Sequence, residues 1–306
     1  MNSTKRITPV ALRLTGAAVV LTAFVLISSA QSPEAEKKLK SRSLVWNPPK
    51  LDSPVAGVAS APPCHLPAVL ARAGQRTSAM VNNLQNFTAQ EDISYRAQDH
   101  QTFAVRFGSE VYDYVVVFQQ HGDKPILDER RHAPHGTPSD IAAESRGLPE
   151  LALLFLPTLQ PDYDMKCDGQ VSWEGQPSWL VEFRQRPDRP SRTFGVRSLK
   201  GAYSAQLYGR AWLDADSGEI LHLESGIMHA LPAIKMYHLY LSISYAPVRF
   251  QSRDVRVWLP HIADVYYDYG EMDNVVRHTF SDFLLFSVDT DQKIASPKSS
   301  DSPGHF

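Results

Sequence analysis

The sequence contains little cysteine and none of the short motifs that mark common enzyme chemistry. Only two cysteines, Cys64 and Cys167, occur in 306 residues. This excludes a disulfide-dense scaffold, and neither cysteine has a second one at zinc-ligand spacing. A glycine-rich phosphate loop, a His-Glu-x-x-His sequence, a Gly-x-Ser-x-Gly nucleophile elbow and a Cys-x-x-Cys pair are also missing. We therefore expect a protein without catalytic residues, cofactor or metal.

A strong charge of either sign is missing as well. The chain has 31 basic and 33 acidic residues, which give a formal net charge of -2. Residues 1–30 carry three of the basic residues and no acidic one, so the remainder has a formal net charge of -5. A mildly acidic chain gives no electrostatic reason to expect nucleic acid or an anionic membrane surface as a partner.

The N-terminus has the order of features found in an export signal. Lys5, Arg6 and Arg13 come first, an apolar run follows at 17–27, and small residues occupy 28–30. This pattern predicts a secretory signal peptide over residues 1–30 and a periplasmic or extracellular location. The alternative is an uncleaved anchor, because residues 12–30 come close to the length that a membrane span needs. In that case this segment would be the chain's contact with the membrane.

Composition divides the rest of the chain into three parts. Residues 31–63 contain several prolines and little periodic apolar content, which predicts a mobile linker. Residues 294–306 are rich in serine, proline and lysine, and we expect a disordered tail there. Residues 64–293 are long enough for one β-rich domain. In an oxidising compartment Cys64 and Cys167 are more economically interpreted as one disulfide than as two free thiols.

Hydrophobic periodicity changes once along this domain. Apolar residues at three- and four-residue spacing from Leu66 to Leu84 predict an amphipathic helix. After Asn86 the period becomes two, which predicts strands with one buried face. The expected strands are 87–95, 102–107, 111–120, 169–174, 179–184, 206–213, 219–225, 236–245, 255–259, 262–269 and 275–288.

Their connections are too short for parallel crossovers. An open sheet of this many strands twists too strongly to stay flat, so it must curl, close or split. We therefore expect a mainly β fold with a few helices: a strongly curved antiparallel sheet or unclosed β-barrel of roughly ten strands, connected as a meander.

A short apolar helix is expected inside this curve. Residues 149–156 begin with Pro149, end before Pro157 and are apolar on all sides, so the segment should be buried on the concave side of the sheet. Aromatic residues also occur in nearly every strand, either as ordinary core packing or as the lining of an apolar cavity. The residues expected to line such a cavity are Leu151, Leu154, Phe155, Trp173, Trp212 and Tyr240.

A few polar groups could carry chemistry. His132 and His135, with Asp140 nearby, could bind a metal, but the proline and glycine around them favour a loop. Asp162 and Asp164 could act as paired carboxylates, although a solvated turn explains them better.

The acidic stretch at 209–224 could be a calcium loop. Its glycine, Gly218, comes one position too early for an EF-hand, and the flanking residues alternate as strands do. A hairpin turn, in which Asp and Ser side chains bond to the backbone and glycine adopts a positive φ, is the better interpretation.

Several segments resemble known exported proteins. The hairpin Gly209–Glu224, after an amphipathic helix and with a buried apolar insertion, resembles the outer-membrane lipoprotein carrier (LolA-like) superfamily. The segments Asn86–Glu91, Phe183–Pro190, Val257–Pro260 and Phe280–Asp289 are similar to a group of exported bacterial proteins of unknown function. The superfamily resemblance implies an unclosed β-barrel whose apolar cavity holds lipid acyl chains, and related members act as envelope sensors. No lipoprotein-binding residue of the carrier matches a position in this chain.

Three functional hypotheses follow. The first is an exported, non-enzymatic protein that binds an apolar or amphipathic ligand, such as a lipid or a lipoprotein acyl chain, in the concavity of the sheet. The second is an envelope sensor or protein-interaction module, and the third is a hydrolase that uses the polar candidates above.

Overall fold

A computed structural model of the chain describes residues 43–59, 62–84, 86–121, 124–133, 148–192, 194–198, 201–250 and 255–286. The expected signal peptide and C-terminal tail, together with His135 and Asp140, lie outside these residues.

The described chain contains one long helix, three short 3-10 helices and twelve strands. The helices are α2 (Leu66–Asn83), η1 (Glu150–Phe155), η2 (Gln160–Asp162) and η3 (Pro232–Ile234). The strands are β1 (Asn86–Asp99), β2 (Val105–His121), β3 (Lys124–His132), β4 (Tyr163–Trp173), β5 (Gln176–Gln185), β6 (Gly195–Ser198), β7 (Gly201–Ser204), β8 (Leu207–Asp214), β9 (Ile220–Ile227), β10 (Leu239–Phe250), β11 (Val255–Tyr269) and β12 (Met272–Leu285).

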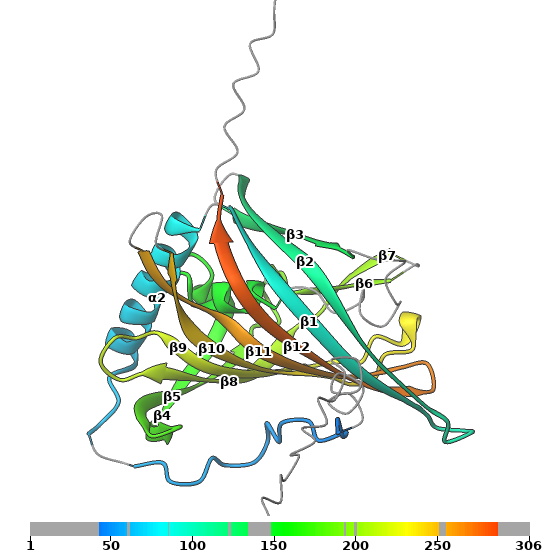
Figure 1. Cartoon of the computed structure of the whole chain (residues 1–306). Helices are drawn as coiled ribbons and strands as arrows, with labels where there is room; N and C mark the ends of the chain where they lie inside the picture. The colour runs from blue at the N-terminus through cyan, green and yellow to red at the C-terminus, as the bar shows by residue number, and fades with distance from the viewer. Residues whose placement is uncertain are drawn as a thin grey trace, which may run out of the picture.

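Ten of these strands form one curved antiparallel sheet, in the order β3-β2-β1-β12-β11-β10-β9-β8-β5-β4 (Figure 1). The sheet is not closed, and β3 and β4 are its edges. The predicted fold class is therefore confirmed. The chain departs from a simple meander where β1 pairs with β12 and where β5 pairs with β8. The hairpin β6–β7 forms a separate two-stranded sheet between β5 and β8 in the sequence.

Some strand boundaries differ from the prediction. The expected strands 102–107 and 111–120 belong to one strand, β2, and 255–259 and 262–269 belong to β11. Pro260 fits within β11 because it lies opposite Tyr245 at a register shift, where the ladder is already irregular. Strand β3 was not predicted, and it ends at His132, which the sequence analysis assigned to a loop.

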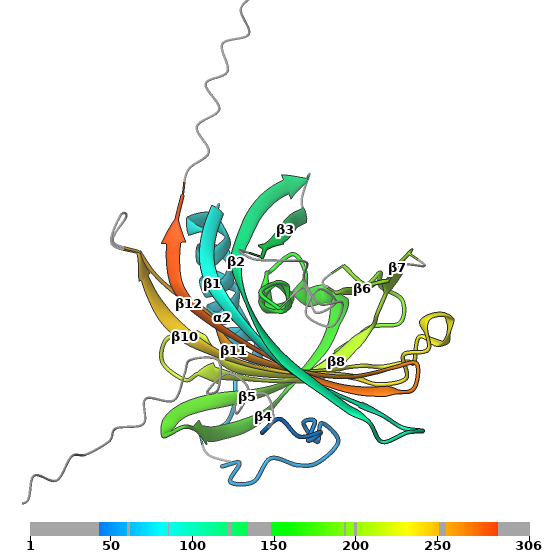
Figure 2. The same ribbon diagram turned by 45° about the vertical axis from the view of Figure 1, so that its right-hand side comes forward.

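The concave face of the sheet carries the main core. In β10, Leu239, Leu241 and Ile243 are buried in this core, whereas the residues between them face the other side. Helix α2 adds its own buried apolar face, and η1 lies within the curve of the sheet (Figure 2). The expected buried helix at 149–156 is therefore present, as a 3-10 helix rather than an α-helix.

The convex face carries charged residues in an alternating row. The register places Lys166 opposite Glu182, Glu182 opposite Arg210 and Arg210 opposite Glu224. The strongest of these pairs joins Arg210 Nε and Glu224 Oε2 at 2.6 Å. Cross-strand pairs of opposite charge stabilise neighbouring strands, so this row has a structural role.

Residues 43–59, which we call the strap, run along this convex face (Figure 1). Leu44 is buried against Tyr266 and Val275. Further along, Ser53 O accepts a hydrogen bond of 2.8 Å from Arg210 Nη1, and Ala59 pairs with Gln170 of β4. This corrects the expectation of a linker free of the domain. The apolar residues of the strap are too irregularly spaced to produce a periodic signal. Leu44, Val55 and Val58 nevertheless pack against apolar residues of the sheet, while Val45 stays exposed.

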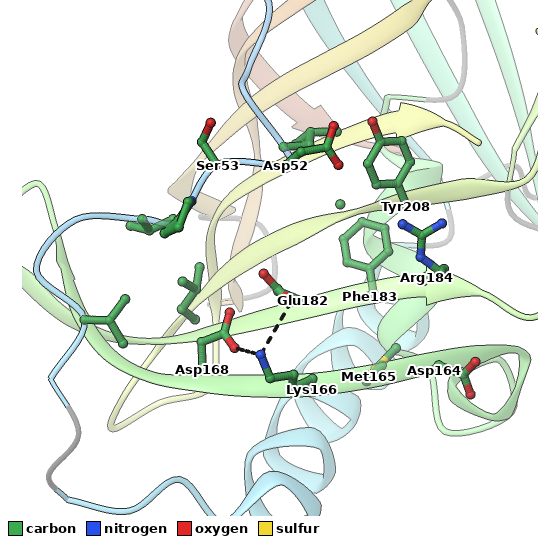
Figure 3. Close-up of a pocket in the computed structure, with 16 residues that line it drawn as sticks. Asp52, Ser53, Asp164, Met165, Lys166, Asp168, Glu182, Phe183, Arg184 and Tyr208 are labelled. Carbon is green, nitrogen blue, oxygen red and sulfur yellow. Dashed lines mark ion pairs between the residues drawn. The ribbon is translucent and has the colours of Figure 1, made fainter. Parts of the chain in front are cut away.

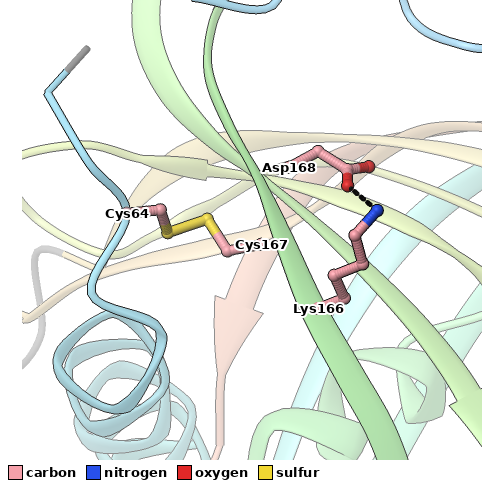
Figure 4. The surroundings of a disulfide bond; sticks show 4 residues. All are labelled: Cys64, Lys166, Cys167 and Asp168. Atoms are coloured by element: carbon pink, nitrogen blue, oxygen red, sulfur yellow. Dashed lines mark ion pairs between the residues drawn. A yellow bond between two sulfur atoms is a disulfide. The ribbon is translucent and has the colours of Figure 1, made fainter. Parts of the chain in front are cut away.

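The disulfide Cys64–Cys167 is present, as predicted (Figure 4). It joins Cys64, two residues before α2, to β4, with Cα atoms 6.2 Å apart and a sequence separation of 103. The bond therefore fixes the beginning of α2, and the end of the strap, to an edge strand of the sheet.

No helix in the described part of the chain is both long enough and apolar enough to cross a membrane.

Candidate functional site

The concave face around η1 is the first candidate site. Leu151, Leu154 and Phe155 are completely buried there, within the main core. The Nε2 of Gln160 donates to Leu70 O of α2 at 3.0 Å and to Phe155 O at 2.7 Å. This single side chain therefore links the end of η1 to α2, while residues 151–155 of η1 are buried in the apolar core.

The other three expected cavity residues lie on the opposite face. Trp173 and Trp212 belong to a convex cluster with Leu180 and Leu221, and Tyr240 packs against Tyr266. They cannot line the concavity together with η1. Alternation with a period of two separates residues into two faces, but it does not say which face is concave, and here both faces are apolar in places. The prediction grouped residues from the two faces for this reason.

A buried charged network lies on the concave side of β1, β3 and β12. Nε and Nη2 of Arg131 bind Oε2 and Oε1 of Glu91 at 2.5 and 2.9 Å. Nδ1 of His278 lies 2.8 Å from Oε1 of Glu91. The side chains of Glu91 and His278 are fully buried, and that of Arg131 is almost so.

The charges of this network shift one another's pKa. Burial alone would raise the pKa of Glu91, but Arg131 and then His278 hold it below its usual range. Burial lowers the pKa of His278 despite its contact with Glu91, so the imidazole is neutral. The ion pair and the contact of the neutral imidazole with Glu91 link the three strands inside the core. None of the three side chains is a hydroxyl or thiol nucleophile.

Sequence reasoning missed this network because its members are far apart in the chain. One local signal was available. Phe87, Ala89 and Ile93 face the core in β1, and Glu91 occupies the same face. A carboxylate at an inward position needs a buried partner, so the alternation predicted a partner without identifying it.

A second candidate is a cleft of about 680 Å³ on the convex face, between the strap and strands β4, β5 and β8 (Figure 3). Lys166 Nζ lies 2.5 Å from Asp168 and 3.9 Å from Glu182. Burial, followed by the neighbouring Asp168 carboxyl group, raises the pKa of Glu182. The guanidinium of Arg184 stacks over the ring of Tyr208 at 5.2 Å. Most of these charged side chains are already paired with one another within and across the strands, which favours a structural role.

The catalytic candidates from the sequence do not form a site. Asp162 is buried and accepts a 2.7 Å hydrogen bond from Arg192 Nε, whereas Asp164 is exposed and lines the convex cleft. His132 is exposed at the end of β3. General acid-base chemistry needs convergent groups, and these three have different surroundings. The paired-carboxylate interpretation is therefore not supported by the geometry.

The neighbours of His222 are those of a serine-histidine-carboxylate catalytic site, namely Ser244 and Glu224. Its Nδ1 lies 3.1 Å from Ser244 Oγ, and its Nε2 lies 3.6 Å from Glu224 Oε1. The second distance is too long for the hydrogen bond that orients a catalytic histidine. The imidazole is also buried beneath Trp173, with ring centroids 3.8 Å apart. This group is best explained as packing of the convex face.

The acidic stretch at 209–224 forms the predicted hairpin, β8–β9. Asp214 Oδ1 accepts hydrogen bonds from the backbone and hydroxyl groups of Ser217, and Gly218 adopts a φ of +75°. The turn also docks on α2, because Arg72 Nη1 donates to Ala215 O at 2.7 Å. Within the described residues, no cluster of three or more histidine, cysteine, aspartate or glutamate side chains could hold a metal ion.

Comparisons with known proteins give limited similarity. No protein-family model and no curated protein sequence matches the chain. Among solved structures, a DUF1329 family protein from Desulfovibrio piger has a TM-score of 0.37 at 11% identity, over 75% of this chain and 94% of its own. A LolA superfamily protein from Nitrosomonas europaea has a TM-score of 0.32 at 12% identity, over 72% of this chain and 94% of its own.

A putative outer membrane lipoprotein-sorting protein domain from Vibrio parahaemolyticus has a TM-score of 0.32 at 13% identity, over 70% of this chain and 90% of its own. These names include the superfamily that the sequence resembles. Similarity at this level carries no argument about function, which is derived below from the chain's own geometry.

Proposed function

We propose that this chain is an exported, non-enzymatic protein that binds an amphipathic, lipid-like ligand, whose apolar part occupies the concave face of the sheet where η1 now lies. The observation that carries the proposal is the packing of η1. Its residues 151–155 are all buried, so the concave face already accommodates a run of apolar groups along its curve. Apolar contacts are non-directional, so an acyl chain could replace them without new polar partners.

The attachment of η1 to α2 makes such a replacement feasible. Gln160 supplies the two side-chain hydrogen bonds described above, and the network of Glu91, Arg131 and His278 holds the strands without help from η1. The sheet could then keep its shape while η1 moves. The predicted signal peptide and the disulfide support an exported location.

Binding of a fluorescent acyl probe in vesicle-free solution tests the proposal. The wild-type chain should bind the probe, and native mass spectrometry should detect a co-purifying lipid. Gln160→Leu removes both hydrogen bonds, each worth about 1 kcal/mol. It should raise the apparent affinity for the probe by up to about thirtyfold, because about 2 kcal/mol less free energy is needed to displace η1.

Gln176→Leu is the matched control, since Gln176 is an exposed residue at the β4–β5 turn. This variant should bind the probe as the wild type does. The absence of both probe binding and a co-purifying ligand would refute the proposed function.

A further inference from the structure

Exposed apolar side chains gather at one end of the molecule. We call this the loop end: the β1–β2 turn (99–105), the segment 231–238 and the β11–β12 turn (269–272). Of the five large hydrophobic residues exposed in the described part of the chain, three are here, namely Phe103 at 72%, Tyr237 at 50% and Val105 at 42%. The other two are Val45 and Leu284.

The three loops lie side by side. The backbone N–H of His100 donates to Glu271 O at 2.9 Å, and that of Gly270 donates to Lys235 O at 2.9 Å. Figures 1 and 2 both show the tips of these hairpins and the loop before β10 together, at the end of the sheet away from α2. The hairpin tips project separately in Figure 1, and none of their residues lines the cleft under the strap.

Phe103 and Lys235 are held in a conformation that such residues rarely adopt. Their φ angles are 56° and 54°, in the left-handed region. Asp99 fixes the first of these turns, because its Oδ1 accepts hydrogen bonds from Gln101 N at 2.9 Å and Thr102 N at 2.8 Å. The backbone at Phe103 is strained, and the turn around it maintains that strain although the side chain is exposed to solvent. This combination indicates a residue exposed for contact with a partner and not one packed in the core.

Charge selects the kind of partner. In the loop end and directly beside it, the cations are Arg106 and Lys235, and the acids that reach the surface are Asp99, Glu271 and Asp273, whereas Asp268 is buried. Two of the acids face histidines, since Asp273 lies 2.8 Å from His100 and Asp268 lies 2.8 Å from His238. A slightly acidic surface opposes anionic lipids. Aromatic residues with polar neighbours, in contrast, suit the interface of a zwitterionic bilayer.

We propose that the loop end is a membrane-docking surface, which inserts Phe103, with Val105 and Tyr237 beside it, into the interface of a zwitterionic phospholipid bilayer. Separate convex tips fit a deformable bilayer, whereas a folded protein partner would require matching pockets. The proposal does not depend on acyl binding in the concavity, which is measured without vesicles.

Flotation of the exported chain with phosphatidylcholine vesicles tests this proposal, after mass spectrometry has established its N-terminus. Phe103→Asn removes the aromatic ring with a residue that accepts a positive φ, so the hairpin should remain folded. This variant should lower partitioning about tenfold, as expected from losing the burial of one aromatic side chain.

Leu284→Asn is the matched control, because Leu284 is 65% exposed and lies in β12, outside the loop end. Its partitioning should stay within about twofold of the wild type. High salt should have little effect, and adding phosphatidylglycerol should not strengthen binding. Hydrogen exchange should slow at 99–105 and 235–238 on vesicles, but not at 284–286. Equal partitioning of wild type and Phe103→Asn, no vesicle binding, or unchanged exchange at the loop end would overturn the proposal.

Discussion

At the scale of single residues, buried charges have the greatest influence on the free energy of unfolding. Glu91 and Arg131 form a bidentate pair inside the concave face, and His278 completes it. Removing one member of a buried pair leaves the other charged and without a partner, which typically costs about 3–5 kcal/mol. The exposed pairs of the convex face contribute much less, because solvent screens them.

The neutral, buried His278 should make stability depend on pH. Unfolding restores its ordinary pKa of 6.5. Below that pH the unfolded chain binds a proton that the folded chain does not, so the free energy of unfolding falls as pH falls. Between about pH 7.5 and 5.5, the free energy of unfolding of His278→Gln should therefore fall less than that of the wild type, by at most about 1.4 kcal/mol, as measured by urea unfolding.

The exposed His261 provides the control, because His261→Gln should leave the wild-type pH dependence unchanged. Glu91 contributes in a lower range. Its pKa is held below 4.5, so its stabilisation is present above that pH and is lost only as pH falls further. Identical slopes for His278→Gln and wild type would contradict the assignment of a neutral buried imidazole.

At the scale of elements, the strap shows how a segment without regular structure is held. Gly169 adopts a φ of +139°, and a Cβ there would lie 2.6 Å from Ala59 O and 2.9 Å from Val58 Cγ1. The glycine therefore permits the strap to approach β4 closely. Apolar contacts at Leu44, Val55 and Val58 supply most of the remaining adhesion.

Gly169→Ala should displace the end of the strap. We expect hydrogen exchange of residues 51–59 to accelerate about five- to thirtyfold, since losing about 1–2 kcal/mol of local stability changes an opening equilibrium by that factor. Gly175→Ala is the control, because Gly175 also has a positive φ, +85°, but has open space around its Cβ position. If both variants change strap exchange equally, backbone strain rather than the close approach is responsible.

At the scale of the whole molecule, long-range connections hold an open sheet together. The first and last strands, β1 and β12, pair in its interior, and the disulfide ties α2 and the strap to the β4 edge. An unclosed sheet has two free edges, so the links between distant parts of the chain matter more than its local hairpins.

Replacing both cysteines by serine should lower the free energy of unfolding by up to about 4 kcal/mol, because the bond closes a loop of 103 residues. Urea unfolding of the double variant and of the oxidised wild type measures this loss. The reduced wild type is the control and should agree with the double variant, since both lack the bond. Two alkylatable thiols in chain isolated without reductant would contradict the disulfide itself.

The sequence by itself determined the local structure. Alternation with a period of two identified the strands other than β3, β6 and β7. Gly218 with Asp214 and Ser217 identified the hairpin turn, and the two-cysteine count identified the disulfide. Strands and turns depend on residues that are neighbours in sequence, and two cysteines leave only one possible pairing. These features can therefore be predicted without the three-dimensional structure.

Only the tertiary structure decided which face of each strand is concave, and therefore that Trp173, Trp212 and Tyr240 lie away from η1. It also decided the pairing of β1 with β12, the docking of the strap, the partners of Glu91 and the meeting of three loops at the loop end. Periodicity shows that alternate residues share a face, but it does not show which face is concave. It also carries no information about contacts between residues that are distant in sequence. The location of the candidate sites depends on those contacts, and for that reason the sequence predicted the fold better than the sites.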